Sequence, residues 1–469
     1  MNPAMSARRR TPAPGRRNLS DRVLGGSVFR LWAGHEHPHY AAFRRAIEAS
    51  QFWPAERLRQ LQQQRLTALL THAAARCPFY QKRFLEAGLD PAQANDADAW
   101  RRLPLLTKAD IQNHGAAMQA VNFPLERRFR NQTGGSTGSP LQFYVDRERL
   151  DTRMASTHRH NAWAGHLPGD WMAELWGNRL DLAADHGVRE WLRQQLLYRT
   201  LSLNTSSVSR QDWHDFVRRL RRKRPRFLLA YALAAVAFAE FVRQERLSDI
   251  RFDGIITSAE VLTAPHRAII EDALGGPVFN RYGCREMSVI ASECAAHSGL
   301  HVNSEALLVE VIPTPLLPAP WGKVVLTDLL NFSMPLIRYE VGDVSRWAEG
   351  DCPCGRSLPR LAEVQGRTTE FLQLPGGRIV SGPALTLVFA DLAAVRQVQF
   401  LQRADASVQL KVVPGAGYGE GARETMRSRL NLYLKGEVPL DIVEVESIAS
   451  EPSGKYLFVV RNTSGTART

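Results

Sequence analysis

The chain has 469 residues, of which 44% are hydrophobic and 23% are charged, and its formal net charge is +13. This length and composition are typical of a globular protein with a large buried core, and they predict two to four domains, or one large domain with an appendage. The five cysteines are too few and too unevenly spaced for a disulfide framework, so that class of small secreted protein is excluded.

Residues 1–20 place several arginines among proline, alanine and serine, with almost no bulky apolar side chains. Such a segment has little apolar surface to bury, so we predict a disordered basic tail. It also lacks the apolar stretch of a secretory signal. The longest apolar run, residues 227–242, is short for a bilayer span and rich in alanine, which favours a buried helix. We therefore expect a cytoplasmic protein.

The predicted elements follow in chain order. Helical periodicity dominates residues 40–120. Five leucines lie near one face of its central helix: Leu58, Leu61, Leu66, Leu69 and Leu70. Thr107, with Asp110 three residues later, predicts a capped helix start. Strands and helices then alternate up to residue 284, which predicts α/β layering; the chain is strand-rich from residue 300, and its last hundred residues predict a compact α+β unit.

A glycine-rich stretch, NQTGGSTGSP, occupies residues 131–140. Glycines let several backbone N–H groups point into one concavity and the hydroxyls add donors, a combination that suits a polyphosphate. It is not the P-loop of nucleoside triphosphatases, because no lysine follows the last glycine. From these residues alone, an ordinary surface loop is an equally good interpretation.

A dense basic cluster, RRLRRKRPR, occupies residues 218–226. It indicates either an anionic partner or a solvated helix face. No aromatic residue interrupts the arginines, so base stacking has no support and we expect no nucleic-acid partner. A weak contact with a membrane surface stays open, and the sequence does not define an oligomeric state.

The cysteines of the second half offer soft metal ligands. Cys294, with either His297 or His301, precedes Cys352 and Cys354, and together they provide four ligands of the type that zinc prefers. A zinc ion there would be structural. Free thiols without metal are the alternative, because the Cys-x-Cys spacing is less specific than Cys-x-x-Cys.

Five segments in order resemble the adenylate-forming superfamily, and most closely its phenylacetate–CoA ligase and CapK-like branch. The segments are TGGSTGSP from Thr133, RYGCREM from Arg281, GKVVLTDLLNFSMPLIRYEVGD from Gly322, CPCGRSLPRLAEVQGRTTEFL from Cys352 and PSGKYLFVVRN from Pro452. The resemblance implies an α/β fold with a large multi-subdomain adenylation domain, residues 21–366, and a small α+β domain, residues 367–469. It also implies an ATP-dependent, AMP-forming ligase that needs Mg²⁺ and passes its acyl group to coenzyme A.

The resemblance implies roles for individual residues. Lys455 would reach the α-phosphate and the substrate carboxylate, Glu286 would bind Mg²⁺, and Arg367 would contact ribose or phosphate. The nucleotide would contact Thr133, Gly134, Gly135, Ser136, Thr137, Gly138, Tyr282, Gly283, Arg285 and Asp343, where Tyr282 faces adenine and Asp343 accepts from the ribose hydroxyls. Trp171, Trp176, Tyr231 and Ala259 are candidates for the acyl pocket.

Two positions depart from the family pattern. Arg285 stands where threonine is common before the glutamate, and at the hinge Glu370 is the nearest match to the usual acidic residues. Arginine at 285 can pair with phosphate or alter the site. The favoured interpretation is a ligase of aryl or arylalkyl acids that forms thioesters. The alternative is a CapK-like protein of polysaccharide biosynthesis that binds nucleotide with weak or no CoA ligase activity, or that uses another acyl acceptor.

Overall fold

The structure is a computed structural model of the chain. It describes residues 25–93, 96–132, 141–176, 193–205, 208–314, 319–365, 371–375, 379–381, 385, 388–389, 392, 394–449 and 457–461. The predicted N-terminal tail, the glycine-rich residues Thr133–Gly138, Arg367, Glu370 and Lys455 lie outside these ranges.

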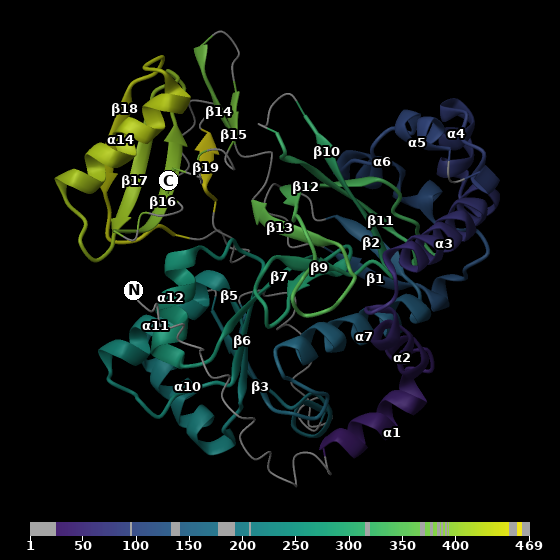
Figure 1. Cartoon of the computed structure of the whole chain (residues 1–469), viewed down its shortest axis with the longest axis horizontal. Helices are drawn as coiled ribbons and strands as arrows, with labels where there is room; N and C mark the ends of the chain where they lie inside the picture. Colours follow the sequence, from purple (N-terminus) through teal and green to yellow (C-terminus); the bar gives the residue numbers. More distant parts are fainter. Residues whose placement is uncertain are drawn as a thin grey trace, which may run out of the picture.

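An eleven-stranded sheet runs through the larger part of the molecule, in the order β10-β11-β12-β13-β9-β8-β7-β6-β5-β3-β4 (Figure 1). Its strands are β3 Met172–Trp176, β4 Thr200–Asn204, β5 Phe227–Tyr231, β6 Gly254–Ser258, β7 Val278–Cys284, β8 Ser288–Glu293, β9 Leu300–Val302, β10 Leu307–Pro313, β11 Gly322–Asp328, β12 Tyr339–Trp347 and β13 Arg360–Gln365. Strands β4, β3, β5, β6 and β7 pair in parallel, whereas the pairings from β7 to β10 are antiparallel.

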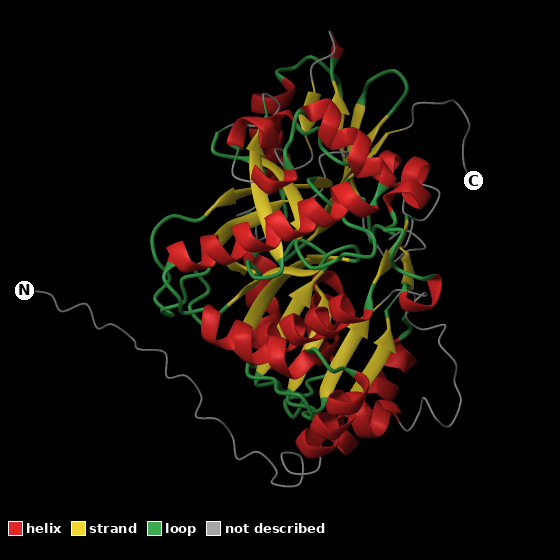
Figure 2. Ribbon diagram, turned by 90° about the vertical axis from the view of Figure 1, so that its right-hand side faces the viewer, coloured by secondary structure: helices red, strands yellow, loops and turns green. Residues whose placement is uncertain are grey.

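Helices cover both faces of the parallel part (Figure 2). One face packs on α10 Arg210–Lys223, α11 Ala232–Gln244 and α12 Ala264–Leu274 through a core that includes Leu228, Ile255 and Val278. The other face carries Phe227, Ile256 and Phe279, which pack on Ala164 just after α7 Arg147–Trp163. Alternate residues of each strand therefore enter different cores, as they must when both faces of a sheet are buried.

The first two N-terminal helices pack on α7, and the next four pack around the antiparallel part of the sheet. They are α1 Gly26–Glu36, α2 Tyr40–Ser50, α3 Ala55–Arg76, α4 Pro78–Ala87, α5 Ala97–Arg102 and α6 Lys108–Met118, followed by the hairpin of β1 Phe129–Gln132 and β2 Gln142–Val145. Four of the five predicted leucines of α3 are buried, and Leu61 is partly exposed. The predicted cap of α6 is confirmed, because Thr107 and Asp110 form a reciprocal capping box.

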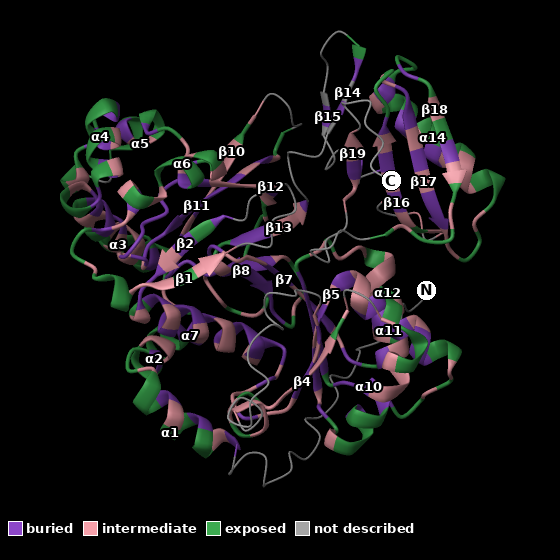
Figure 3. Cartoon of the chain, turned by 180° about the vertical axis from the view of Figure 1, so that it is seen from behind, coloured by how far each residue is buried: buried purple, intermediate pink, exposed green. Residues whose placement is uncertain are grey.

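The C-terminal part builds a separate core (Figure 3). Its elements are β14 Phe371–Gln373, β15 Ile379–Ser381, β16 Val395–Gln402, β17 Val408–Pro414, α14 Glu420–Leu434, β18 Leu440–Glu444 and β19 Val459–Arg461. Strands β18, β17, β16 and β19 form a four-stranded sheet, on which Met426 and Leu430 of α14 pack. The predicted domain boundary at residue 367 lies outside the described residues and stays a prediction.

One secondary-structure prediction was wrong in part. The apolar run 227–242 is not one helix, because its first five residues form β5 and only Ala232 onward is helical. A strand buried on both faces reads as a continuous apolar run, so hydrophobicity alone does not separate it from a buried helix. Within the described residues, no helix combines the length and the hydrophobicity that a membrane crossing requires.

The basic cluster 218–226 forms the end of α10 and the turn into β5. Arg221 and Arg226 pair with Asp249 and Asp253, and a surface cavity of about 570 Å³ lies between these side chains. The cavity is at the amino ends of the parallel strands, away from the predicted nucleotide site. The expectation of no nucleic-acid partner stays a prediction.

Candidate active site and metal site

Tyr282 and Asp343 meet at the carboxyl end of β7. The phenol Oη of Tyr282 donates a hydrogen bond of 2.7 Å to Oδ2 of Asp343 on β12. Burial, together with the Asp343 carboxylate, raises the pKa of Tyr282 well above its ordinary value, so the phenol stays protonated and remains a donor. Two residues that lie 61 positions apart in the chain, both predicted to contact the nucleotide, are thus brought into contact.

Glu286 lies in the turn between β7 and β8 and forms a second pair of this kind. Its Oε1 accepts a hydrogen bond of 2.9 Å from the phenol of Tyr339, the first residue of β12. Both side chains are buried. The sequence interpretation missed Tyr339, although the residue stands in the quoted segment RYEVGD and four positions before Asp343.

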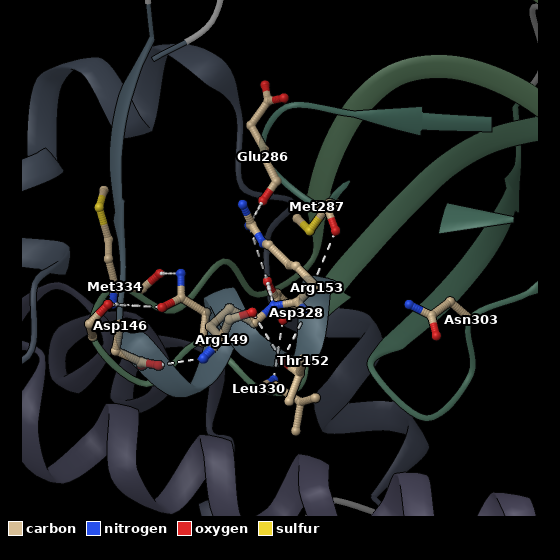
Figure 4. A network of polar contacts seen from close by, with 12 residues as sticks. Asp146, Arg149, Thr152, Arg153, Glu286, Met287, Asn303, Asp328, Leu330 and Met334 are labelled. Carbon is tan, nitrogen blue, oxygen red and sulfur yellow. Dashed lines mark hydrogen bonds and ion pairs between the residues drawn. The ribbon is translucent and has the colours of Figure 1, made fainter. Parts of the chain in front are cut away.

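A buried polar network holds the Glu286 turn from below (Figure 4). Arg149 Nε of α7 donates to Asp328 Oδ2 at 2.7 Å, and Arg149 Nη2 donates to the carbonyl of Met287 at 3.2 Å. Arg153, one turn later, donates to the backbone carbonyl of Glu286. The carboxylate of Glu286 points away from Arg153 (Figure 4). The arginines thus fix the backbone of the turn, and the carboxylate, whose Oε1 accepts from Tyr339, is not engaged by them.

Gly283 lies at a bulge in the β7–β8 pair, where the register shifts between Tyr282 and Gly283. A Cβ added at Gly283 would stand 2.6 Å from the backbone oxygen of Ser288, closer than real Cβ contacts come. Ser288 itself has a φ of 67°. The hairpin therefore requires glycine at 283 for a steric reason that holds without any ligand.

The remaining predicted nucleotide residues are less fully described. Arg285 lies in the turn beside Glu286, and its backbone oxygen accepts from Arg153 Nη1 at 3.4 Å. Thr133, Gly134, Gly135, Ser136, Thr137, Gly138, Arg367 and Lys455 lie outside the described residues, so their roles stay predictions. On either side of the glycine-rich stretch, β1 and β2 are paired with Gln132 opposite Gln142.

Three of the four acyl-pocket candidates lie at the carboxyl ends of the neighbouring strands β3, β5 and β6, and the fourth precedes β3. Trp176, at the end of β3, and Tyr231, at the end of β5, have ring centroids 4.2 Å apart. Ala259 follows β6 with a φ of 69°. Trp171 instead precedes β3, where its ring contacts the Lys223 ammonium at 4.4 Å, so it does not join the other candidates.

The cysteine cluster consists of Cys294, His301, Cys352 and Cys354, whose ligand atoms lie within 4.8 Å of one another. The sulfur atoms of Cys294 and Cys352 are 3.6 Å apart, and Cys354 Sγ is 3.3 Å from His301 Nε2. Zinc bonds of about 2.3 Å to sulfur and 2.0 Å to nitrogen give ligand separations of about 3.5–3.8 Å in a tetrahedron. The two contacts given are close to those separations, and all four ligand atoms lie within 4.8 Å. His297, the other candidate, instead pairs with Glu293 at 3.1 Å.

The surroundings of the cluster favour the ligand forms of His301 and Cys352 and oppose the thiolate of Cys294. His301 Nδ1 donates to the carbonyl of Leu358 at 3.2 Å, which leaves the lone pair on Nε2. Burial lowers the pKa of His301 to about 4, so the imidazole is neutral. Burial opposes ionisation of Cys352, yet hydrogen bonds from Ser298 and from the backbone of Cys354 lower its pKa to about 7. Burial raises the pKa of Cys294 to about 12.

Comparison with solved structures identifies the fold. The chain aligns with 2-hydroxyisobutyryl-CoA ligase in the postadenylation state, in complex with R3-HIB-AMP, with a TM-score of 0.69 and 22% identity over 88% of this chain and 91% of that one. With the same ligase in complex with 2-HIB-AMP and CoA in its thioesterification state the TM-score is 0.58, over 88% and 91% of the two chains. The chain therefore has the fold of the adenylate-forming CoA ligases, and the predicted fold class is confirmed.

Curated relatives give a narrower likeness. The chain is 28% identical to phenylacetate-coenzyme A ligase of Thermus thermophilus over 375 residues, which is 76% of this chain and 82% of the relative. It is 24% identical to the enzyme of that name from Escherichia coli, over 68% of this chain and 74% of the relative. The four curated relatives all carry this name, so the polysaccharide alternative gains no support from them. No family model matches the chain. The predicted resemblance to phenylacetate–CoA ligases is confirmed.

Proposed function

We propose that the chain is an ATP-dependent, AMP-forming ligase that activates a carboxylic acid and transfers the acyl group to the thiol of coenzyme A. The observation that carries this proposal is the convergence of the Tyr282–Asp343 and Tyr339–Glu286 pairs at one end of β7. The fold and the similarity to phenylacetate-coenzyme A ligases support it. Ligands of open α/β sheets bind beyond the carboxyl ends of the strands, which is where these pairs lie.

In the first step, an oxygen of the acid would attack the α-phosphorus of ATP, and the bond to pyrophosphate would break. In the second, the sulfur of coenzyme A would attack the acyl carbonyl and AMP would leave. Both steps accumulate negative charge on oxygen, so they require cations and hydrogen-bond donors rather than a protein nucleophile. Lys455, Arg367 and the N–H groups of residues 133–138 are proposed to supply them.

Each described residue has a defined part in this proposal. The Tyr282 ring offers a flat surface for adenine, while its hydroxyl orients the Asp343 carboxylate toward the ribose. Glu286 fits a Mg²⁺ ligand, because its carboxylate is directed away from the arginines that hold its backbone (Figure 4). Magnesium would supply charge neutralisation at the phosphates, and Tyr339 would hold the Glu286 oxygen in place.

The test is acid-dependent pyrophosphate release with Mg-ATP, measured over a panel of aryl, arylalkyl and aliphatic acids, followed by consumption of coenzyme A thiol. We expect release with at least one acid and its loss by at least about a hundredfold in Lys455→Ala. Lys435→Ala, at an exposed lysine after α14, is the matched control. Folded protein that binds ATP but releases no pyrophosphate with any acid would contradict the proposal. Pyrophosphate release without consumption of coenzyme A thiol would leave the adenylation step in place and would show that the acyl acceptor is another molecule.

We also propose that Cys294, His301, Cys352 and Cys354 bind a structural zinc ion that ties the β8–β9 turn to the segment before β13. The four-ligand geometry supports this. Arg360 also joins the same two segments, because it donates to Ser298 Oγ in the turn and to the carbonyl of Gly350 before β13. Metal analysis of the purified protein should find about one zinc per chain, lost in Cys352→Ser and retained in Cys77→Ser, a buried cysteine outside the cluster. A fully folded, metal-free wild-type chain would refute the assignment.

A further inference from the structure

Arg281 is a buried cation that the proposed mechanism does not use. It is 7% exposed on β7, immediately before Tyr282, and it donates to the amide oxygen of Asn161 at the end of α7. Among the residues that the structure describes, no carboxylate forms an ion pair with it, and its Nε has no hydrogen-bond partner. Burial lowers the pKa of Arg281 to about 10, so the side chain is still charged at neutral pH.

Such an arrangement is costly, since a buried charge is normally paired with its opposite. Two other buried arginines follow this rule, since Arg149 and Arg159 pair with Asp328 and Glu305 at 2.7 Å. Arg360, which is 6% exposed, instead donates to backbone carbonyls. Arg281 has no carboxylate partner in the described structure, and its Nε has no acceptor. A guanidinium held in place but only partly satisfied points to an anion that arrives from outside the chain.

The part of α7 around Asn161, the partner of Arg281, supplies further donors and no acid. Residues 155–163 of α7 read ASTHRHNAW, without an acidic residue. His160 and His166 are buried, and the Nδ1 atom of each has no partner in the described structure. Burial, followed by the charges of His166, Arg44 and Arg281, lowers the pKa of His158 to about 3, so this neighbour does not compete as a second cation.

Arg281 shares a sheet face with the acyl-pocket candidates. It lies opposite Ser258 of β6, Ser258 lies opposite Tyr231 of β5, and the Tyr231 ring contacts Trp176. Side chains in register on neighbouring parallel strands project to the same side. These side chains therefore form a row on one face of the sheet, which runs from the two aromatic rings through Ser258 to the guanidinium of Arg281. Tyr282, the next residue of β7, projects to the other face with the proposed nucleotide contacts.

Acids of the same face are engaged elsewhere. Glu174 accepts a hydrogen bond of 2.7 Å from Ser202, and the carboxylate of Asp151 on α7 binds His37 at 2.6 Å. The buried Ser292, opposite Arg281 on β8, has no partner for its hydroxyl in the described structure. A second carboxylate on a bound substrate would find at this place a guanidinium fork and a free hydroxyl.

We propose that Arg281 selects an acid substrate that carries a second carboxylate, with the carbon skeleton against Trp176 and Tyr231 and the unreactive carboxylate on the guanidinium. This inference rests on the proposed ligase function and names its substrate class. Arg281 contacts the substrate at a distance from the reacting atoms, so it sets specificity and does not take part in bond formation.

The experiment measures kcat/KM for pyrophosphate release with two matched pairs, phenylacetate against para-carboxyphenylacetate and pentanoate against glutarate. Wild-type protein should prefer the diacid of at least one pair by about a hundredfold or more, because a site built to bind a charged group rejects an analogue that lacks it. Arg281→Met should remove this preference, and Arg281→Lys should retain part of it. Arg226→Met, at the far end of the sheet, should leave the ratio unchanged.

Asn161→Asp separates this role from a structural one, because it gives Arg281 a carboxylate partner inside the protein. It should raise the unfolding midpoint and lower the diacid preference at the same time, and it keeps the test valid if Arg281→Met does not fold. A wild-type preference for the monoacids, or an equal loss with all acids in the Arg281 variants, would overturn the inference and leave the ligase function intact. If no acid gives pyrophosphate release, both the ligase function and the inference on Arg281 are refuted.

Discussion

The ion pair beneath the Glu286 turn permits a quantitative prediction. Arg149 and Asp328 are 1% and 0% exposed, with 2.7 Å between Nε and Oδ2. Arg149→Met removes one charge and leaves a carboxylate fully buried, a change that typically costs 3–5 kcal/mol. Arg153 stays 3.7 Å from the same oxygen and Leu330 N–H still donates to Asp328, so we expect the lower end, about 3 kcal/mol.

Urea unfolding followed by circular dichroism measures this loss, and with a slope of about 3 kcal/mol per M the midpoint should fall by about 1 M. The double variant Arg149→Met/Asp328→Asn should lose at least about 1 kcal/mol less unfolding free energy than the two single variants lose together, since no uncompensated charge remains. Because Arg149 also holds the carbonyl of Met287, the KM for ATP should rise in the single variant.

The chain contains a matched control at its surface. Arg221 and Asp249 have the same 2.7 Å contact but are 49% and 52% exposed, so Arg221→Met should leave the midpoint unchanged within error. Equal effects of Arg149→Met and Arg221→Met, or strictly additive single variants at 149 and 328, would refute the argument that burial determines the importance of this pair.

Three further outcomes are expected. Gly283→Ala places a Cβ against the backbone oxygen of Ser288, so the unfolding free energy should fall by about 1–3 kcal/mol. The affinity for ATP, measured by calorimetry, should weaken as well. An unchanged affinity would show that the bulge does not position the nucleotide residues. Tyr339→Phe removes the hydrogen bond to the Glu286 carboxylate, so the Mg²⁺ concentration for half-maximal pyrophosphate release should increase about tenfold. An unchanged Mg²⁺ concentration would argue against Glu286 as the metal ligand. Burial lowers the pKa of His158 to about 3 and of His166 to about 4 from the ordinary 6.5, so the unfolded chain binds more protons between pH 6.5 and 4 and stability should fall as the pH drops through that range. His158→Gln should flatten this pH dependence in urea titrations, and an unchanged slope would exclude His158 as a cause.

The sequence predicted those parts of the fold in which local rules and tertiary packing agree. Thr107 and Asp110 start α6 with a capping box, as the pattern indicated. The division of residues 227–242 into β5 and α11 was not predictable from hydrophobicity, because both pieces are buried. Only the pairing of β5 with β3 and β6 decides that Phe227–Tyr231 is extended.

The candidate site was predictable where motifs contribute residues, and not where the fold does. Tyr282, Glu286 and Asp343 come from quoted segments, and the structure brings Tyr282 and Asp343 together. Arg149 and Arg153 were missed, because they stand in a helix whose sequence carries no motif and act through long-range contacts with Asp328 and with the backbone of the Glu286 turn. Arg281 was quoted only as the first letter of a motif, and its burial without an acidic partner is visible only in three dimensions.

The alternation of side chains along β7 has an evolutionary consequence. Phe279 and Arg281 project toward α7, whereas Val278, Asn280 and Tyr282 project to other surroundings. Substitutions at positions 279 and 281 can therefore alter the side of the strand that faces α7 while Tyr282 keeps its place on the opposite side. The alternation ends at the bulge, where position 283 accepts only glycine.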